Sequence, residues 1–464
     1  MKLKYESRNA WKYERENNNI NAVMEYSKGY MKFLDNAKTE RTSVKEIVKM
    51  AQENGYISIE EAMEKGSIKA NDKIYAVNKG KAVALFIIGE KELQEGMKIV
   101  GGHIDAPRID LKPNPLYEDA NLGLFKTHYY GGIKKYQWTA LPLSLQGVVM
   151  LHDGTKVEVS IGEDETDPVF VISDILPHLA SSQMQKKLAE SIEGEQLNLL
   201  IGSIPMEDED KDAITANILR ILNEKYNMVE EDLFTAELSI VPNGKARDLG
   251  LDRSMVLAYG QDDRVCSYAA VKALLDSDKT LHTAVALCVD KEEVGSQGNT
   301  GMQSKFFENT VAELVLLEGN YSDLKVRRAM ANTKVLSADV TAGYDPSYPE
   351  IGEKRNSTDM GHGVVLCKYV GSRGKGGSND ANSEFMNEIR RIFNAGDVVW
   401  QTTELGKVDQ GGGGTIAHIL ANYGAEVIDC GVGLLSMHAP FEVSSKVDLY
   451  EMYKGYKAFF NINL

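Results

Sequence analysis

The chain has 464 residues, of which 43% are hydrophobic and 26% charged, a composition typical of a soluble globular protein with two or more domains. Lysine and arginine total 52 against 68 aspartate and glutamate, and the net charge of -16 excludes nucleic acid and anionic membranes as main partners. The sequence has no apolar run of the roughly 18 residues that a bilayer span needs. Its polar first residues lack the apolar centre of a secretory signal, so we expect a cytoplasmic protein.

The N-terminal part mixes helical and strand-like patterns. In the segment 42–55, Ser43 precedes Glu46 by three residues, the spacing of a capping box, and apolar side chains then follow at helical spacing. This pattern predicts a helix that ends at the glycine of the segment. Segments 73–90 and 96–107 are rich in β-branched residues and are interrupted by glycine, which predicts buried strands.

The middle of the chain has a different character. The turn dipeptide Asp153-Gly154 stands between two strand-like runs and predicts a β-hairpin over 146–162. Further on, the acidic tract 206–212 precedes a helical pattern over 213–226. These features indicate a β-rich module inserted into the chain.

From about residue 246 onward, strand-like runs alternate with helical patterns. This alternation favours an α/β fold with a mixed, mostly parallel central sheet flanked by helices. The predicted helices cover 264–278 and 382–396, and the predicted strands cover 283–290 and 312–320. We therefore assign 1–112 plus 246–464 to one discontinuous domain and 113–245 to an inserted domain.

The four cysteines lie in mostly apolar segments and show no paired spacing. This distribution predicts buried, reduced thiols and argues against a disulfide framework or a structural zinc site. The cysteines are Cys266, Cys288, Cys367 and Cys430.

Carboxylates and imidazoles follow several of the strand-like runs. Because a parallel sheet brings the carboxyl ends of its strands to one edge, we expect these side chains to converge. Two imidazoles with several carboxylates suit zinc, cobalt or manganese better than calcium, which prefers oxygen ligands alone. The residues are His103, Asp105, Asp262, Asp263, Glu292, Glu293, Asp339 and His438.

The neighbouring Glu292 and Glu293 are the hardest of these residues to explain by stability alone. Like charges at the end of a buried strand repel and lose hydration, unless cations lie between them. One glutamate would then bind a metal ion while the other handles protons.

Each other residue has an ordinary alternative when taken singly. Asp262 and Asp263 precede a helical pattern and would serve as an N-cap. Asp339 would be a turn residue, and His438 a histidine of the core. The occurrence of all of these residues at strand ends favours the metal site.

The motifs around these residues resemble those of the aspartyl aminopeptidase family, whose members are zinc exopeptidases with two metal ions. The resemblance implies a zinc-exopeptidase-like fold and removal of the amino-terminal residue of short peptides. It also implies two divalent ions per subunit, zinc or else cobalt or manganese. The matching motifs, in family order, are GGHIDAP, GQDDR, DKEEVGS, LSADV with DPSYP, GGGTIAHILA and LLSMHAPFE.

The resemblance also implies a role for each ligand. Asp262 would bridge the two metal ions. His103 and Asp339 would complete one metal site, and Glu293 and His438 the other.

Three further roles follow from the resemblance. Asp105 would hydrogen-bond the imidazole of His103 and hold its orientation. Glu292 would be the general base that takes a proton from the water between the metals and passes it to the departing amine. His178, in the inserted oligomerisation domain, would reach the active site of a neighbouring subunit and contribute to it as an oxyanion or metal contact. The family forms dimers through this domain and then tetrahedral dodecamers.

The sequence departs from the family where an acidic substrate side chain would lie. The family run DMAHAVHPNY corresponds here to DVTAGYDPSY, with Ala342 and Asp345 in the histidine positions. Asp345 adds negative charge there, whereas Lys368 and Arg373 are candidates for compensating positive charge. A preference for acidic amino-terminal residues is therefore left open.

Two other functions remain to be separated from an aminopeptidase. A related two-metal carboxypeptidase or amide deacylase would use the same ligands on another part of its substrate. A shell-forming or peptide-binding protein without catalysis would have lost a metal ligand or the general base. The five implied ligands and the implied base are all present: His103, Asp262, Glu293, Asp339, His438 and Glu292.

Overall fold

The computed structural model describes residues 3–463, and contacts divide the chain into two units. Unit 1 contains the residues up to Asp105, Ala246–Met437 and those from Glu442 onward, and unit 2 contains Ala106–Lys245 with His438–Phe441. The helices of unit 1 are α1 (Ala10–Glu16), α2 (Ile20–Asn36), α3 (Glu40–Glu53), α4 (Ile59–Lys65), α7 (Gln261–Leu275), α8 (Phe306–Glu318), α9 (Asp323–Ala331), α10 (Ser383–Ala395), α11 (Ala417–Ala421) and α12 (Lys446–Asn461).

The centre of unit 1 is a nine-stranded sheet. In spatial order its strands are β1 (Ile57–Ser58), β2 (Lys73–Asn78), β3 (Ala82–Ile87), β14 (Ala284–Val289), β4 (Lys98–His103), β15 (Lys334–Ser337), β19 (Glu426–Gly431), β17 (Val364–Cys367) and β18 (Trp400–Thr403). The pairs β1–β2, β14–β4, β4–β15, β15–β19 and β17–β18 are parallel, and the other three neighbouring pairs are antiparallel. The predicted mixed, mostly parallel sheet is therefore confirmed.

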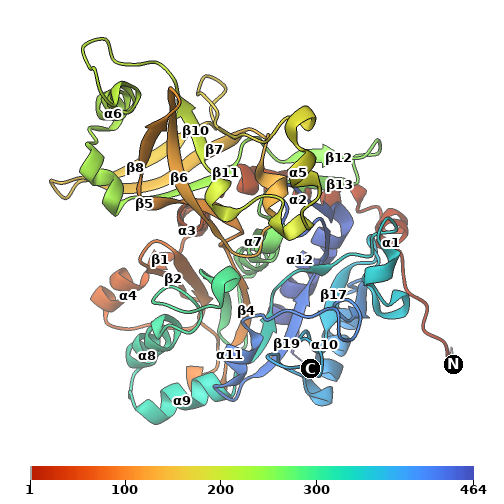
Figure 1. The fold of residues 1–464 in the computed structure, drawn as a ribbon. Coiled ribbons are helices and arrows are strands. Elements are labelled where there is room, and N and C mark those ends of the chain that lie inside the picture. The colour runs from red at the N-terminus through yellow and green to blue at the C-terminus, as the bar shows by residue number, and fades with distance from the viewer. Residues whose placement is uncertain (1–2, 464) are drawn as a thin grey trace. The chain divides into compact units, whose positions relative to one another are not determined.

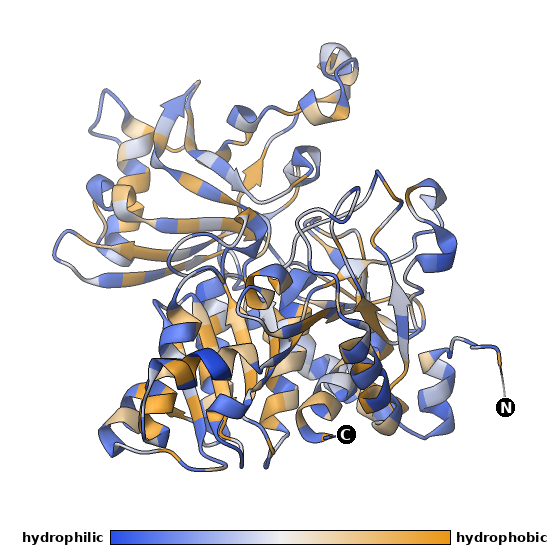
Figure 2. Ribbon diagram, turned by 90° about the horizontal axis from the view of Figure 1, so that it is seen from below, coloured by the Kyte–Doolittle hydropathy of each residue, from blue (hydrophilic) through white to orange (hydrophobic). Residues whose placement is uncertain are grey.

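Helices cover both faces of this sheet (Figure 1). On β3, Val83 and Leu85 pack into the core under α2, α3 and α7, whereas Ala84 and Phe86 pack into the core under α4 and α8. Because both faces are buried there, the inner strands β3 and β14 are apolar along their whole length, and the inner part of the sheet is largely orange in Figure 2. Such strands appear in the sequence as continuous apolar runs.

A second, five-stranded sheet also belongs to unit 1. Its strands, in spatial order, are β12 (Arg247–Leu249), β13 (Met255–Ala258), β21 (Glu442–Ser445), β20 (Gly433–Leu435) and β16 (Thr341–Ala342). The expectation that one parallel sheet carries every polar strand end was therefore wrong for Asp262, because β13 lies in this smaller sheet.

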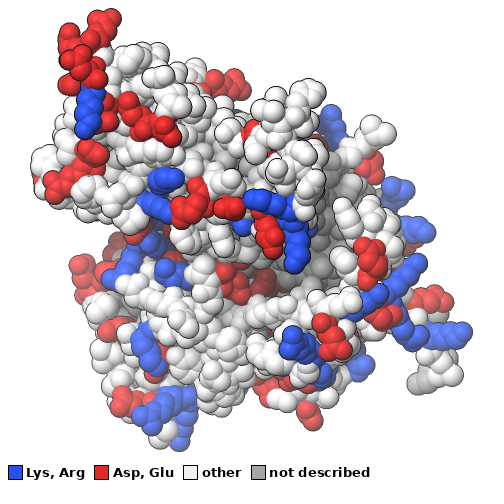
Figure 3. Space-filling view, viewed as in Figure 1, with Lys and Arg blue, Asp and Glu red and all other residues white. Residues whose placement is uncertain are grey.

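Unit 2 is built on a seven-stranded antiparallel sheet with α5 (Ser181–Met184) and α6 (Ala213–Tyr226). In spatial order the strands are β8 (Lys156–Ile161), β7 (Leu143–Met150), β11 (Glu237–Pro242), β5 (Arg108–Asp119), β6 (Leu122–Tyr130), β10 (Leu199–Gly202) and β9 (Val171–Ile172). The predicted hairpin is confirmed, since β7 and β8 pair antiparallel around Gly154. The acidic tract before α6 is exposed, and its charges gather at the surface over that segment (Figure 3).

Two predictions of local structure were wrong. The helix α3 begins at Glu40 and not near Ser43, because Thr39 and Thr42 form the capping box. The segment 312–320, predicted as a strand, is the C-terminal half of α8. A short apolar run of this kind does not distinguish a strand from a buried helix.

Two further expectations concern the cysteines and the membrane. All four cysteines are free and buried, as predicted. None of the helices within 3–463 is both long and apolar enough to cross a bilayer.

A buried carboxyl pair joins α1 to α12. Lys454 donates to Glu14 at 2.6 Å and to both carboxylate oxygens of Glu451 at 3.1 Å. Burial and the hydrogen bond to Glu14 raise the pKa of Glu451 to about 9. Burial would also raise the pKa of Glu14, but hydrogen bonds to Glu451 and Lys454 lower it. Glu451 therefore keeps its proton in the folded protein at neutral pH.

This pair predicts a pH dependence of stability. Between about pH 5 and about pH 9 the folded state holds the Glu451 proton and the unfolded chain does not, so the free energy of unfolding falls as the pH rises. Gln in place of Glu451 mimics the protonated carboxyl, and Glu451→Gln is expected to lose stability less steeply over this range. Urea unfolding at several pH values measures both slopes, with the exposed Glu53→Gln as control. Equal slopes for Glu451→Gln and the wild type would contradict the assignment.

Candidate metal centre

Three neighbouring parallel strands place polar residues at one edge of the central sheet. His103 is the last residue of β4 and pairs in register with Val289, the last residue of β14. Glu292 and Glu293 follow β14 in a single 3-10 turn, and Asp339 follows β15. The predicted convergence of these strand ends is confirmed.

The start of α7 supplies two more carboxylates. The N-cap position is occupied by Gly260 in the left-handed region, and no side chain caps the helix. Asp262 and Asp263 have non-helical backbone angles inside the first turn. Such angles are also those of an N-cap residue, so the N-cap alternative for these two aspartates is left open, and both side chains belong to the ligand groups described next.

The carboxylates and the imidazole form two groups of three side chains. Within each group, the ligand atoms lie within 4.8 Å of one another. One group is His103, Asp262 and Glu293, and the other is His103, Asp263 and Asp339. The Nε2 atom of His103 lies 3.3 Å from Oδ1 of Asp262. The sequence analysis had named Asp263 among the residues at strand ends but had given it no role as a metal ligand.

Asp263 packs against the backbone of β4. A Cβ atom on Gly102 would lie 2.5 Å from its Oδ2 atom, so this position of the GGH motif requires glycine. The backbone N–H of His103 donates to the same oxygen at 3.4 Å. In the sequence, the glycine at position 102 was the only sign that another side chain, that of Asp263, packs against this part of β4.

Asp105 joins the ends of β4 and β14. Its Oδ1 accepts from the backbone N–H of Glu292 and its Oδ2 from that of Glu293, each at 3.2 Å. The Nδ1 atom of the His103 ring lies 3.3 Å from Asp105 Oδ1 and 3.0 Å from the Asp105 carbonyl oxygen. The ring is thus oriented from its Nδ1 side, and its Nε2 atom faces Asp262. A residue that orients a ligand imidazole in this way is typical of metal sites.

Burial and mutual repulsion disfavour the negative charges of the carboxylates in the centre. Burial, together with the neighbouring carboxylates Asp263 and Glu292, raises the pKa of Asp339 well above its usual value. Burial and the charge of Asp262 do the same for Asp263. Burial alone would lower the pKa of His103, but its contacts with Asp105 and Asp262 raise it well above its usual value. A centre of this kind is stabilised by added positive charge.

The donor set fits a divalent metal ion. Imidazole nitrogen and carboxylate oxygens are the ligands that zinc prefers among those present. In addition, the Oδ1 atom of Asp263 is buried and makes no hydrogen bond. A buried carboxylate oxygen in this condition is costly unless it meets a cation.

Three other side chains, which were not among the predicted site residues, support the centre. The Oε2 atom of Glu442 accepts from the backbone N–H of Asp262 at 3.1 Å. Ser267 donates to the carbonyl oxygen of His103 at 2.8 Å. Arg264, which is almost fully buried, donates from Nε to the carbonyl oxygen of Ile104 at 3.1 Å.

The two remaining predicted residues, His438 and His178, belong to unit 2. Neither of the two ligand groups includes His438, whose Nδ1 lies 2.9 Å from the carbonyl oxygen of Gly132. His178 is exposed in the short turn Pro177–Leu179. Their roles at the metal centre stay predictions.

The fold and the ligand groups are those of a metal-dependent hydrolase of the zinc-exopeptidase class. The family model described as aminopeptidase I zinc metalloprotease (M18) matches residues 33–460. The chain belongs to this family, peptidase family M18, and is a zinc metallopeptidase with aminopeptidase activity.

Relatives with closely similar sequences and folds support this assignment. A Clostridium acetobutylicum protein named "Probable M18 family aminopeptidase 1" is 56% identical over 459 residues, which are 98% of each chain. The solved structure of aminopeptidase I from the same organism is 53% identical, has a TM-score of 0.93 and covers 99% of this chain and 100% of its own. The M18-family aminopeptidase structure from Thermotoga maritima is 44% identical, has a TM-score of 0.95 and covers 99% and 100%.

The position of Asp105 leads to a prediction about metal binding. In Asp105→Asn one carboxylate oxygen becomes an NH₂ group, which cannot accept from a backbone N–H, so the turn and the His103 ring lose their common anchor. We expect the metal dissociation constant to rise about 10- to 100-fold, as measured by competition with a chelator. The exposed Asp278→Asn is the control. An unchanged metal affinity in Asp105→Asn would contradict this role.

Proposed function

We propose that the protein hydrolyses the amino-terminal residue of short peptides and that Glu292 is the general base. One observation carries this proposal: Glu292 lies beside both ligand groups without belonging to either. Its Oε2 atom is 3.8 Å from Nε2 of His103, and its side chain is 16% exposed. A carboxylate that is partly accessible and not a ligand is suited to accept a proton at such a centre.

We propose that two divalent ions, zinc or else cobalt or manganese, occupy the centre. When bound, such ions supply Lewis acidity, which polarises the scissile carbonyl and makes water more acidic. Asp263 joins the predicted ligands as a candidate because it belongs to one of the two groups. The predicted ligands are His103, Asp262, Glu293, Asp339 and His438.

In this proposal the residues of the chain do the proton transfer. Glu292 accepts a proton from the water that adds to the peptide carbonyl and then donates it to the nitrogen of the departing chain. Asp105 fixes the backbone of Glu292 and so fixes the distance of the base from the centre. A thiol nucleophile is not needed, and burial raises the pKa of Cys288 and of Cys367 to about 12, which keeps both thiols protonated.

A preference for acidic amino-terminal residues has weaker support. Lys368 forms an ion pair with Asp380, which also pairs with Lys375 at 2.8 Å. Asp380 is shared by two lysines, so this cluster keeps one net positive charge. Arg373 is exposed, and Asp345 lies in the segment that would face the substrate in the family resemblance.

We further propose that the protein forms homodimers through the inserted domain 113–245 and that dimers assemble into a dodecamer. Large apolar side chains are exposed around His178 in unit 2, among them Leu176 at 50%, Leu179 at 73% and Met184 at 71%. Exposed apolar clusters of this kind mark protein interfaces. A yeast mApe1 described as a dodecamer has the same fold at 21% identity, with a TM-score of 0.75 and coverage of 94% and 96%.

We place this activity in the cytoplasm. Four buried cysteines without a disulfide fit a reducing compartment.

The base assignment predicts the effect of Glu292→Gln. Because the amide cannot accept the proton, turnover should fall by about 10²- to 10⁴-fold while the metal content stays that of the wild type. Amino acid release and metal analysis on the same samples measure both quantities, and the exposed Glu64→Gln is the control. Full activity of Glu292→Gln would show that another group is the base.

One series of peptides tests which end of the substrate is cleaved and which amino-terminal residue is preferred. We expect cleavage of peptides with a free amino terminus, no cleavage of their acetylated forms, and loss of activity with a chelator. Release of the carboxyl-terminal residue or of the acetyl group would instead identify a carboxypeptidase or a deacylase. Peptides that differ only in their first residue, Asp, Glu, Leu or Ala, then give kcat/KM for each. A higher value for Asp and Glu would support the acidic preference, and a higher value for Leu would reject it.

A further inference from the structure

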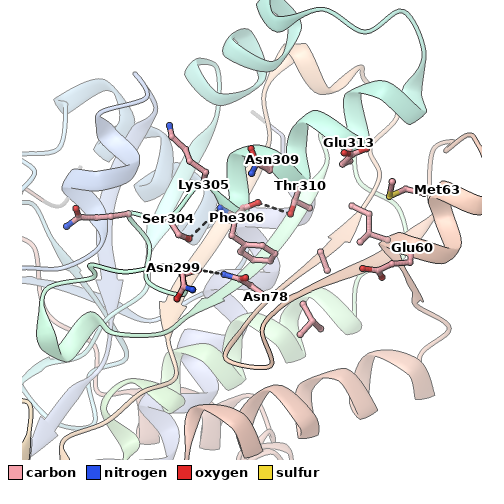
Figure 4. Close-up of a pocket in the computed structure, with 14 residues that line it drawn as sticks. Glu60, Met63, Asn78, Asn299, Ser304, Lys305, Phe306, Asn309, Thr310 and Glu313 are labelled. Carbon is pink, nitrogen blue, oxygen red and sulfur yellow. Dashed lines mark hydrogen bonds between the residues drawn. The ribbon is translucent and has the colours of Figure 1, made fainter. Parts of the chain in front are cut away.

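Unit 1 has a groove that the proposed catalysis does not use. It has a volume of about 630 Å³ and lies between α4, the end of β2, and the loop and first turns of α8 (Figure 4). Helix α4 supplies Glu60 and Met63, and α8 supplies Asn309 and Glu313. No residue of the two ligand groups lines it.

The groove runs along an open part of a sheet edge. Strand β3 pairs with the whole of β2, from Lys73 to Asn78. On the other side, β1 pairs only with Ile74 and Tyr75, because the chain turns into α4 at Ile59. Within residues 3–463 no strand pairs with 76–78 on this side. An open edge of this kind can take up an extended peptide as an added strand.

The groove offers apolar and amide side chains next to this edge. Met63 is 47% exposed and Val77 is 38% exposed. The side-chain amide of Asn78 donates to the carbonyl oxygen of Asn299 at 2.7 Å and so links β2 to the far wall (Figure 4). An extended peptide would place alternate side chains on the apolar surface and its peptide groups near the amides.

The charges of the groove select a basic partner. Neither Glu60 nor Glu313 forms an ion pair with a lysine or arginine in the described part of the chain. Lys305, the cation of the groove, pairs with Glu308 at 2.5 Å. The two carboxylates therefore favour a ligand with lysine or arginine side chains.

We propose that this groove binds an extended, basic peptide segment as a strand added to β2, at a site separate from the catalytic centre. The proposal rests on the open edge and the charges, and it does not depend on the catalytic roles assigned above.

The groove is connected to the loop that carries the proposed base. Gln303, which lines the groove, donates from its side chain to the carbonyl oxygen of Gly295 at 3.1 Å and from its backbone N–H to that of Ser296 at 3.2 Å. Asn299 lies on the same loop, whose ends are joined by Thr300 donating to Asp290 at 2.6 Å. A bound peptide therefore restrains the segment that follows Glu292 and Glu293.

Binding is tested with a dye-labelled peptide, Lys-Val-Thr-Val-Lys, acetylated and amidated at its ends, on the metal-loaded protein. The blocked amine keeps it from being a substrate of an aminopeptidase. Fluorescence anisotropy should show saturable binding, weaker binding of Glu-Val-Thr-Val-Glu, and loss of binding when the backbone nitrogens are methylated. Equal binding of the three peptides, or of none, would overturn the proposal.

Charge reversal locates the site. Glu60→Lys with Glu313→Lys should weaken binding of the basic peptide about tenfold or more, since two attractions become repulsions. Glu53→Lys with Glu64→Lys changes the net charge equally outside the groove and should leave the affinity unchanged, with thermal melting as the check on folding. Equal affinity in both double variants would overturn the proposal. So would a change in sedimentation of Glu60→Lys with Glu313→Lys, because a second copy of the chain would then occupy the groove.

Hydrogen exchange tests the connection to the loop. The amides of 290–303 should exchange more slowly with the basic peptide bound, and this slowing should be lost in Gln303→Ala. Peptide binding without slower exchange of 290–303 would refute the connection between the groove and this loop, and only the peptide-binding site would remain. A protein that hydrolyses peptides but does not bind the blocked peptide would refute only the groove.

Discussion

The arrangement of the centre depends on one constraint: several carboxylates are buried together at the edge of a sheet. Like charges held this close repel, and burial removes the water that would screen them. Asp263 is the clearest case, since one of its oxygens is buried without a hydrogen bond. The surrounding chain offers the backbone N–H of His103 and one imidazole to these carboxylates, which balances only part of the charge. A divalent metal ion supplies the remainder, and this need connects the fold to the chemistry of the M18 family.

Asp105 makes this arrangement rigid. It binds two successive backbone N–H groups of one strand end and orients the imidazole of another, so β4 and β14 cannot move independently at this edge. The same turn continues through Gly295 and Ser296 to Gln303 and the groove beside β2. The proposed base Glu292, the proposed ligand His103 and the wall of the groove are therefore linked by hydrogen bonds within unit 1. A peptide bound in the proposed groove would act on the centre through the segment 290–303, which carries Glu292 and Glu293.

Much of the fold followed from hydrophobic patterns, and the errors have physical causes. The segments that became β14, α7, α10 and the β7–β8 hairpin were predicted because each pattern fits one kind of structure. The segment in α8 was mistaken for a strand because its side chains face a sheet, and a short apolar run looks alike in both. The true start of α3 was missed because two capping boxes fit the sequence. Ser43 and Glu46 have the spacing of a capping box, but Thr39 and Thr42 form the one in the structure. Asp263 was given an N-cap alternative but no role at the metal centre, since its position depends on the space left by Gly102 on another strand.

The sequence by itself determined the class of fold and the types of side chain available to a metal, and the division of roles between Glu292 and Glu293 stays a prediction. These depend on composition, on local periodicity and on which residues stand at strand ends. Tertiary structure alone decided which carboxylates share a centre, how Asp105 holds two strand ends, and where β2 is left without a neighbour. Those properties arise from contacts between residues far apart in the chain, where a shift of one strand or one helix start changes which atoms meet.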